Sequence, residues 1–201
     1  DYALAAHPEW GRSTYDHFAD GDGVCFTSYL RPVMGLRPKH RMASTGIPWQ
    51  FPADMSIICW LEHCGHDYDV ITDEDLHREG VACLTPYNVV LNGTHSEYYS
   101  ERMMDATEQY LAAGGRVMYL GANGYYWVVG FRDDEPACME VRKLDAGSRA
   151  WQAAPGEYHL QTTGEKSGIW RIRGRAPQKL TGVGFTSEGM DECMPYRRLP
   201  D

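Results

Sequence analysis

The sequence lacks several features that would place it in a specialised class of proteins. It contains no apolar stretch near the roughly 18 residues that a membrane helix needs, so we expect no membrane span. It has 19 Lys and Arg residues against 28 Asp and Glu residues, a formal net charge of −9, and no long basic cluster. Since nucleic-acid affinity depends largely on Lys and Arg neutralising phosphates, we expect neither DNA nor RNA as a main partner.

The six cysteines are scattered and form no Cys-x-x-Cys pair: Cys25, Cys59, Cys64, Cys83, Cys138 and Cys193. Several lie in apolar settings, as Cys59 does between Ile58 and Trp60, which is typical of reduced cysteines that act as small hydrophobes. No secretory leader opens the sequence, so we predict a cytoplasmic protein. Because the chain starts at Asp1 without an initiator Met and stops at Asp201 after a polar stretch, we expect both ends to be cuts within a longer polypeptide or products of processing.

The composition divides the chain into three expected segments around one principal core. Residues 1–50 are rich in Gly and Pro with aromatics interspersed, which predicts a loop-rich segment draped over the site. Residues 51–130 are expected to form the α/β core. Beyond about residue 125 the pattern changes to alternating runs, so residues 131–201 are predicted to be a β-rich extension, either within the same domain or as a partial second domain.

Local patterns predict the individual elements. Apolar residues at helical spacing predict helices over residues 52–65, 73–78 and 100–114. Short apolar or alternating runs predict strands over residues 68–72, 88–92, 116–120, 126–131, 137–144, 168–173 and 182–185. Ser100 is a suitable N-cap and Gly65 a suitable helix stop. The strands 88–92 and 116–120, with a helix between them, form a βαβ unit, which implies parallel strands.

The segment Gly93–Tyr99 is a candidate site because it directly follows the strand 88–92. In open α/β sheets, ligands bind beyond the carboxyl ends of the strands. His95 and Glu97 are two residues apart, so in a turn both side chains can converge on one ligand. The alternative is a capping pair, in which Glu97 is favoured by the positive end of the following helix. Spacing alone favours this alternative, because short motifs often match by chance.

The turn Leu120–Tyr125 follows the next strand, where α/β hydrolases and glutamine amidotransferase-like proteins carry a nucleophile elbow. The elbow residue here would be Asn123, which cannot serve as a nucleophile. No cysteine has the Gly-x-Cys-x-Gly setting, so a cysteine amidotransferase is not expected. A structural Asn-Gly turn is favoured, with backbone donors that could still face the site.

The segment Ser13–His17 is rich in oxygen and nitrogen donors. A phenolate such as that of Tyr15 is a hard anionic donor suited to Fe(III), and a carboxylate is its natural companion. Residues 63–66 also contain three possible metal ligands. They lie at a predicted helix end, where His is favoured by the dipole, and no distant Cys or His pair completes a tetrahedral site. We therefore predict a helix end at 63–66.

Five blocks of the sequence resemble, in order, the large (beta) subunits of the N,N-dimethylformamidase family. The blocks are residues 1–15, 51–54, 68–76, 92–98 and 120–127. The likeness is close up to about residue 130, weak through the β-rich part, and faint around residues 182–198. The resemblance implies a bacterial protein with a class I glutamine amidotransferase-like, flavodoxin-like α/β fold, in which helices flank a parallel sheet and the cysteine triad is absent.

The resemblance also implies an iron centre. In that family a mononuclear non-haem iron, expected as Fe3+, is held by two tyrosines and one glutamate and hydrolyses N,N-dimethylformamide to formate and dimethylamine. Carried over by motif, Tyr15 and Glu97 are the expected metal ligands, and His95 is the histidine beside them. The resemblance places the second tyrosine upstream of Asp1 and a further acidic residue beyond Asp201, so this chain alone is expected to hold an incomplete site.

Two functions are weighed on these grounds. The first is an iron-dependent amidohydrolase, in which Glu97 and His95 are catalytic, His95 transfers protons, and Asn123 or nearby N–H groups stabilise the oxyanion. The family would add a small amide substrate, a small accessory subunit, and a homo- or hetero-oligomer. The second is a non-catalytic amidotransferase-like domain that binds a small ligand or supports a neighbouring domain.

Overall fold

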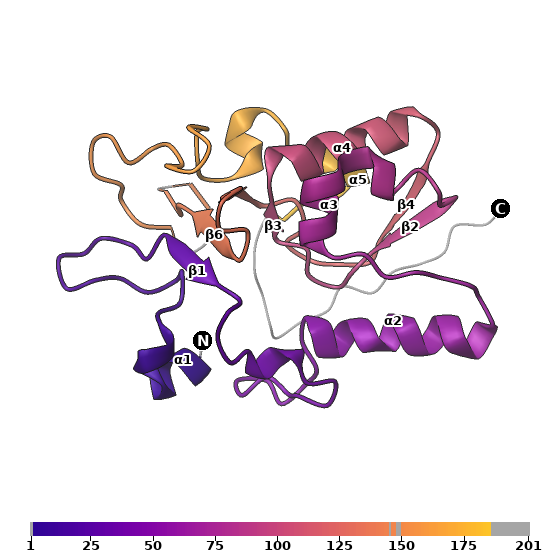
Figure 1. Ribbon diagram of the computed structural model, residues 1–201, viewed down its shortest axis with the longest axis horizontal. Coiled ribbons are helices and arrows are strands. Elements are labelled where there is room, and N and C mark those ends of the chain that lie inside the picture. Colours follow the sequence, from indigo (N-terminus) through magenta and orange to yellow (C-terminus); the bar gives the residue numbers. More distant parts are fainter. Residues whose placement is uncertain (1, 145, 148–149, 186–201) are drawn as a thin grey trace.

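The computed structural model describes residues 2–144, 146–147 and 150–185, and Figure 1 shows its elements. The α-helices are α1 (Tyr2–Ala6), α2 (Phe51–Cys64), α3 (Asp73–Glu79), α4 (Glu101–Ala112) and α5 (Gln178–Thr181). The strands are β1 (Phe26–Ser28), β2 (Val89–Asn92), β3 (Tyr98–Tyr99), β4 (Arg116–Tyr119), β5 (Trp127–Phe131) and β6 (Cys138–Val141). Short 3₁₀ helices cover Pro8–Trp10, Met34–Leu36, Gly80–Cys83 and Trp170–Arg173. The three predicted helices are confirmed to within two residues at each end.

The described strands form two sheets. β2 and β4 pair in parallel, with Val90 opposite Val117, and α4 connects them, which confirms the predicted βαβ unit. The other sheet has the order β1-β6-β5-β3, in which β3 and β5 are parallel and the remaining pairs are antiparallel. A strand of the N-terminal segment, β1, therefore pairs with β6 from far along the chain.

Helix α4 forms where an N-cap precedes a clear apolar face. Ser100 Oγ accepts a hydrogen bond from the Met103 N–H at 3.3 Å, which satisfies a donor that the helix itself leaves unpaired. Helix α3 is capped in the same way, because Thr72 Oγ1 accepts from the Asp75 N–H at 3.2 Å. Five residues on one side of α4 are buried: Met103, Met104, Ala106, Thr107 and Tyr110. This face fixes α4 against the core.

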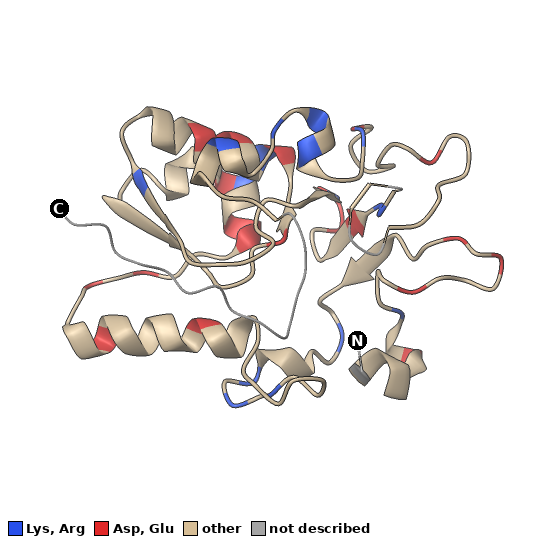
Figure 2. Ribbon diagram, turned by 180° about the vertical axis from the view of Figure 1, so that it is seen from behind, with Lys and Arg blue, Asp and Glu red and all other residues tan. Residues whose placement is uncertain are grey.

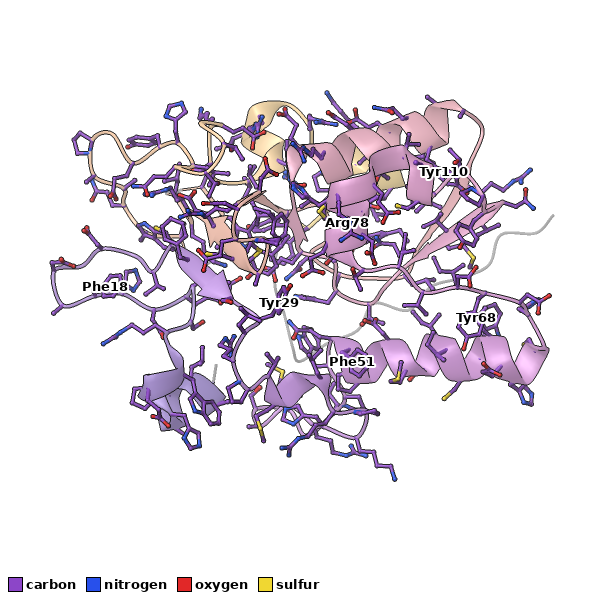
Figure 3. The ribbon with its side chains drawn as sticks, viewed as in Figure 1. Phe18, Tyr29, Phe51, Tyr68, Arg78 and Tyr110 are labelled. Atoms are coloured by element: carbon purple, nitrogen blue, oxygen red, sulfur yellow. The ribbon has the colours of Figure 1, made fainter. Side chains whose placement is uncertain are left out.

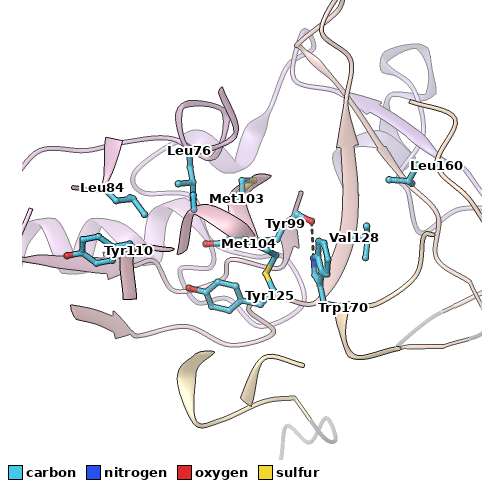
Figure 4. Packing of buried hydrophobic residues seen from close by; sticks show 11 residues of the cluster. Leu76, Leu84, Tyr99, Met103, Met104, Tyr110, Tyr125, Val128, Leu160 and Trp170 are labelled. Atoms are coloured by element: carbon cyan, nitrogen blue, oxygen red, sulfur yellow. Dashed lines mark hydrogen bonds between the residues drawn. The ribbon is translucent and has the colours of Figure 1, made fainter. Parts of the chain in front are cut away.

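The main core lies where α3 and α4 meet β3 and β5 (Figure 4). Met103 and Met104 are fully buried, and Trp170, from a 3₁₀ helix far along the chain, joins the same cluster. The Trp170 indole N–H donates to the Tyr99 carbonyl at 3.0 Å, which ties this segment to β3. Burial of each large apolar side chain contributes about 1.5–3 kcal/mol, so the chain beyond β6 is part of the same core.

Helix α2 is apolar but contributes little to this core. Of its 14 residues only Pro52 and Leu61 are buried. Figure 1 shows α2 beneath β2 and β4, with α3 and α4 above them. Figure 3 shows Phe51 at the start of the helix and Tyr68 near its far end, where Tyr68 Oη donates to Glu62 Oε1 at 2.7 Å. The helix therefore lies on the core as an outer layer.

Three predicted strands are absent from the described chain: 68–72, 168–173 and 182–185. Among the described residues, 68–72 and 182–185 have no neighbouring strand to pair with. Without a partner strand, the backbone N–H and C=O groups of an extended segment cannot form the hydrogen bonds of a sheet. Trp170–Arg173 is a 3₁₀ helix instead. The backbone N–H groups bond within this segment, from Ile172 to the Ile169 carbonyl and from Gly174 to the Arg171 carbonyl, both at 3.1 Å, so they are not available to a partner strand.

The surface agrees with the composition. No helix among the described residues is long and apolar enough to cross a membrane. Figure 2 shows Lys and Arg distributed over several elements and interspersed with Asp and Glu. Five cysteines are free among the described residues: Cys25, Cys59, Cys64, Cys83 and Cys138. Cys59, which was expected to act as a small hydrophobe, is exposed, as is Cys64, so that expectation is wrong for these two. Cys193, the end of the expected third segment and most of the faintly similar stretch 182–198 lie outside the described residues.

Candidate functional site

Two turns, one after β2 and one after β4, lie against each other and form the candidate site. The Ala122 N–H donates to the Thr94 carbonyl at 3.0 Å, and the Tyr125 N–H donates to the Ser96 carbonyl at 2.9 Å. A Cβ atom at Gly121 would lie 2.5 Å from a carbonyl oxygen of the first turn, so only glycine permits this approach. The parallel pairing of β2 and β4 thus brings the turns together at one edge.

Tyr15 reaches the same place from the N-terminal segment. The turn Ser13–Asp16 is closed by a bond from the Asp16 N–H to the Ser13 carbonyl at 2.9 Å and by one from the Ser13 N–H to the Asp16 carboxylate at 3.0 Å. The Tyr15 phenol then donates to Glu97 Oε1 at 2.7 Å. The phenol and the carboxylate that were predicted to meet are 82 residues apart and lie in direct contact.

Glu97 is the centre of the cluster and is 7% exposed. Its Oε1 accepts from Tyr15 Oη at 2.7 Å and from Trp127 Nε1 at 2.9 Å, while its Oε2 faces His95 Nε2 at 2.9 Å. A buried carboxylate is costly unless hydrogen bonds replace its water, and three side chains do so here. The capping alternative is wrong for the Glu97 side chain, because α4 is capped by Ser100.

The electrostatics keep Glu97 ionised and the neighbouring phenols protonated. Burial pushes the pKa of Glu97 upward, but hydrogen bonds from His95 and Tyr15 and the charge of Lys143 outweigh it, so this pKa lies below 4.5. Burial, assisted by the charge of Glu97, raises the pKa of Tyr15 to about 12. Burial also raises the pKa of Tyr98 well above its ordinary value. At neutral pH the cluster contains one carboxylate and two neutral phenols.

Lys143 is the charged group of the cluster that sequence reasoning did not identify. It is fully buried. Its ammonium lies 3.2 Å from the ring centroid of Tyr15 and 4.5 Å from that of Trp127, and it donates to Tyr98 Oη at 3.1 Å. Aromatic faces stabilise a desolvated cation. A lysine inside the alternating run 137–144, which was predicted as a strand, is the sequence signal that could have revealed it.

The His95 side chain is 7% exposed and presents one nitrogen to Glu97. Its other nitrogen, Nδ1, is buried and has no hydrogen-bond partner among the described residues. The Trp49 ring lies 5.0 Å from the imidazole and covers it on one side. With a proton on Nε2, donated to Glu97, the lone pair of Nδ1 is available to accept a proton; the hydrogen-bond network is the basis for this tautomer.

Asn123 lies in the second turn, beside this cluster. Its φ of 54° is in the left-handed region that Asn tolerates better than most residues, which agrees with the structural Asn-Gly turn favoured from the sequence. Within the described part of the chain, no hydrogen bond joins its side chain to His95 or Glu97. The structure therefore brings Tyr15, His95 and Glu97 together and places Asn123 in the adjacent turn.

The other predicted donor group is a helix end, as expected. Helix α2 ends at Cys64, and Gly65 follows with a φ of 70° as its C-cap. Among the described residues no three His, Cys, Asp or Glu side chains gather into a group that could hold a metal ion.

Comparison with known proteins identifies the family. The family profile described as N,N-dimethylformamidase beta subunit-like, C-terminal, matches residues 2–201. The chain belongs to this family. Two relatives, each described as an N,N-dimethylformamidase beta subunit, come from Paracoccus aminophilus and from Alcaligenes sp, and each is 50% identical over 192 residues. These residues are 96% of this chain and 25% of each relative, so the chain spans about a quarter of the length of these dimethylformamidase subunits.

The iron that resemblance to the dimethylformamidase family implies can be tested against the donors present. The oxygens of Tyr15 and Glu97 are hard donors suited to Fe(III). Tyr15 Oη and Glu97 Oε1 lie 2.7 Å apart. In an octahedral site with metal–oxygen bonds of about 2.1 Å, two adjacent ligand oxygens are roughly 3 Å apart, which is close to this distance. The pair therefore fits a shared hard cation. Since metal centres ordinarily use three or more protein ligands, further ligands would have to come from other residues.

Proposed function

We propose that this chain carries the catalytic site of an enzyme that hydrolyses small N-substituted amides, with N,N-dimethylformamide, cleaved to formate and dimethylamine, as the first substrate to test. The observation that carries the proposal is the buried cluster in which Glu97 joins Tyr15 and His95. The names of the two 50% identical relatives support the same reaction class. A buried group of titratable residues with shifted pKa values is typical of active sites.

His95 is the proposed proton carrier. Amide hydrolysis forms a C–O bond to water and breaks the C–N bond, so one proton must leave the water and one must reach the departing nitrogen. Glu97 holds Nε2 of the imidazole, which leaves Nδ1, without a partner among the described residues, to accept the first proton and deliver the second. A carboxylate that orients an imidazole has the same role in Ser-His-Asp triads, although no serine nucleophile is required here.

Tyr15 and Glu97 are the residues that would hold a mononuclear iron, as Fe3+. When bound, the ion supplies Lewis acidity toward the amide carbonyl and the attacking water. Without metal, the raised pKa of Tyr15, about 12, keeps the phenol protonated at neutral pH. The ammonium of Lys143, 3.2 Å from the Tyr15 ring centroid, favours the anionic form that a metal ligand must adopt. Asn123 or the N–H groups of its turn are proposed to stabilise the oxyanion.

The proposed enzyme also needs parts that this chain does not contain. The chain spans about a quarter of its relatives, whose name, beta subunit, indicates a further subunit in those proteins. We therefore include in the proposal further iron ligands from the rest of the polypeptide, a small accessory subunit, and a homo- or hetero-oligomer. We also propose that the enzyme acts in the cytoplasm and that its fold is of the class I glutamine amidotransferase type, as parallel β2 and β4 with helices on both sides support.

The second candidate is a non-catalytic amidotransferase-like domain that binds a small ligand or supports a neighbouring domain. One observation favours it: the buried ammonium of Lys143 already provides a positive charge beside Tyr15 and lowers the pKa of Glu97. The carboxylate therefore has a counter-ion without any metal. This candidate predicts that the full-length protein is stable and functional when free of metal.

The decisive experiment measures iron content and amide hydrolysis of the full-length protein. We expect stoichiometric iron, a visible tyrosinate-to-iron absorption band, and release of dimethylamine from dimethylformamide. Tyr15→Phe should weaken or shift the band, because one of two expected tyrosinate ligands is lost, and should remove most of the activity. Tyr68→Phe is a matched control, because the Tyr68 phenol also donates to a glutamate at 2.7 Å, but at an exposed place. Metal-free protein with no hydrolysis of any N-substituted amide would leave the second candidate.

A further inference from the structure

A residue in the first turn of helix α2 is hydrogen-bonded to the turn that carries His95. Asp54 Oδ1 accepts from the Thr94 N–H at 2.7 Å and from Thr94 Oγ1 at 2.7 Å. The carboxylate also lies against the chain at Gly93, where an added Cβ would be 3.0 Å from Asp54 Oδ1. The turn is therefore held from the α2 side at the residue immediately before His95.

The residues just before α2 contact the imidazole itself. The Trp49 ring lies 5.0 Å from the His95 ring. Gln50, which follows it, has φ 54° and ψ −128°, a strained conformation for a residue other than glycine. The N–H groups of Ala53 and Asp54 donate to the Gln50 carbonyl at 2.8 and 3.0 Å and fix it in place. Backbone strain of about 1–3 kcal/mol persists where the surrounding structure requires it, often at functional sites.

We infer that Asp54 is a positioning residue for His95. The inference rests on the proposed function, because it assigns a purpose to the orientation of the His95 imidazole. Asp54 fixes the backbone of Thr94, so that Nε2 of His95 stays on Glu97 and Nδ1 stays available. The apolar helix α2, which buries only Pro52 and Leu61, thereby has a role that its packing does not explain.

The physical reason is the sensitivity of proton transfer to distance. A His95 Nε2 to Glu97 Oε2 contact of 2.9 Å is lost if the turn shifts by about 1 Å, and such displacements reduce rates by about 10²-fold. Thr94 lies between Asp54 and the turn after β4, since its carbonyl also accepts from the Ala122 N–H at 3.0 Å. One side of this residue is thus held by β4's turn and the other by Asp54.

The test compares Asp54 with a carboxylate that makes the same bonds elsewhere. Asp75 Oδ2 accepts from the N–H of Thr72 at 3.0 Å and from Thr72 Oγ1 at 2.8 Å, in the exposed cap of α3. In the full-length enzyme we expect Asp54→Ala to lower kcat about 10- to 100-fold with KM changed less than about threefold. Asp54→Asn, whose amide oxygen can accept both bonds, should restore kcat to within about threefold of wild type. Asp75→Ala should lower stability only.

A second measurement does not depend on activity. The ¹⁵N chemical shifts of the labelled His95 ring in metal-free full-length protein report which nitrogen carries the proton. We expect a proton on Nε2 in wild type, Asp54→Asn and Asp75→Ala, and altered shifts in Asp54→Ala. Wild-type kcat and shifts in Asp54→Ala, or an Asp54→Asn variant as impaired as Asp54→Ala, would overturn the inference. An inactive wild type whose His95 shifts still respond to Asp54→Ala would refute the proposed function and retain the positioning role.

Discussion

Glu97 and Glu140 are two buried carboxylates with different surroundings. Glu140 is fully buried and accepts from Arg142 Nε at 2.7 Å, from the N–H groups of Gln161 and Thr162 at 3.0 and 2.8 Å, and from Thr162 Oγ1 at 2.9 Å. Glu97 is also saturated, but two of its donors belong to a phenol and an imidazole. The donors of Glu140 are a guanidinium, backbone amides and an alcohol, whereas a phenol and an imidazole are side chains that can bind a metal or transfer protons.

The difference separates a structural carboxylate from a reactive one. Glu140 connects the loop at 161–162 to β6 through hydrogen bonds from backbone N–H groups, which do not ionise in the usual pH range. Around Glu97 lie a buried ammonium, two phenols and an imidazole, one nitrogen of which has no partner in the described part of the chain. Burial and charge alone therefore do not identify the site. The chemical type of the partner side chains does.

The largest effect on activity is expected from removing Glu97, the carboxylate assigned to the reactive cluster. In the full-length enzyme, Glu97→Ala removes the group that orients His95 and binds the Tyr15 phenol. We expect kcat/KM for the amide to fall about 10²- to 10⁴-fold, the range of general acid–base contributions. Steady-state kinetics check this, and circular dichroism verifies folding. Retention of more than a tenth of the activity would show that Glu97 is not part of the chemistry.

The next largest effect is a loss of folding stability when Glu140, the structural carboxylate, is removed. Glu140→Ala leaves the buried Arg142 guanidinium without its main partner, so we expect the free energy of unfolding to fall by about 3–5 kcal/mol. Denaturant unfolding measures it, and the activity per folded molecule should change by less than about threefold. Glu157→Ala is the control, since that glutamate lies 3.8 Å from Arg142 and is partly exposed. Equal effects of the two substitutions would contradict the assignment.

A smaller effect tests the charge balance around Glu97. Since Lys143 helps to lower the pKa of Glu97, the ionised carboxylate contributes stability above about pH 4.5 that is lost as the pH falls through its lowered pKa. Lys143→Met should reduce this pH-dependent contribution by about 1 kcal/mol or less. Unfolding measured between pH 3 and about 6 checks it. In a Glu97→Gln background the same substitution should show no such pH dependence.

A pH effect of the opposite direction is expected in alkali. The raised pKa of Tyr15, about 12, means that the folded protein keeps a proton that the unfolded chain releases above an ordinary value of 10.0. The stability that this provides is complete below pH 10 and is lost as the pH rises toward 12. Wild type should therefore lose stability more steeply over this range than Tyr15→Phe. Parallel curves in urea unfolding would show that the phenol is not buried as described.

By itself the sequence determined the local elements and the family. The N-cap at Ser100, the stop at Gly65 and the strand 88–92 depend on residues a few positions apart, so their patterns are legible in the chain. The same holds for the ordered blocks around His95 and Glu97 that carry the family resemblance. Predicted strands without a partner, such as 68–72, were wrong, because pairing is a long-range property.

Only the tertiary structure decided which side chains meet. The contact of Tyr15 with Glu97 joins residues 82 positions apart, and it exists because β1 pairs with β6 and because the turns after β2 and β4 lie together. Lys143 lies in the cluster for the same reason. The sequence shows only that a lysine follows β6 and does not show that its ammonium is buried beside Tyr15. Helix and turn preferences depend on residues a few positions apart in the sequence. The pKa of a buried side chain and the residues that it contacts depend instead on all the segments packed around it.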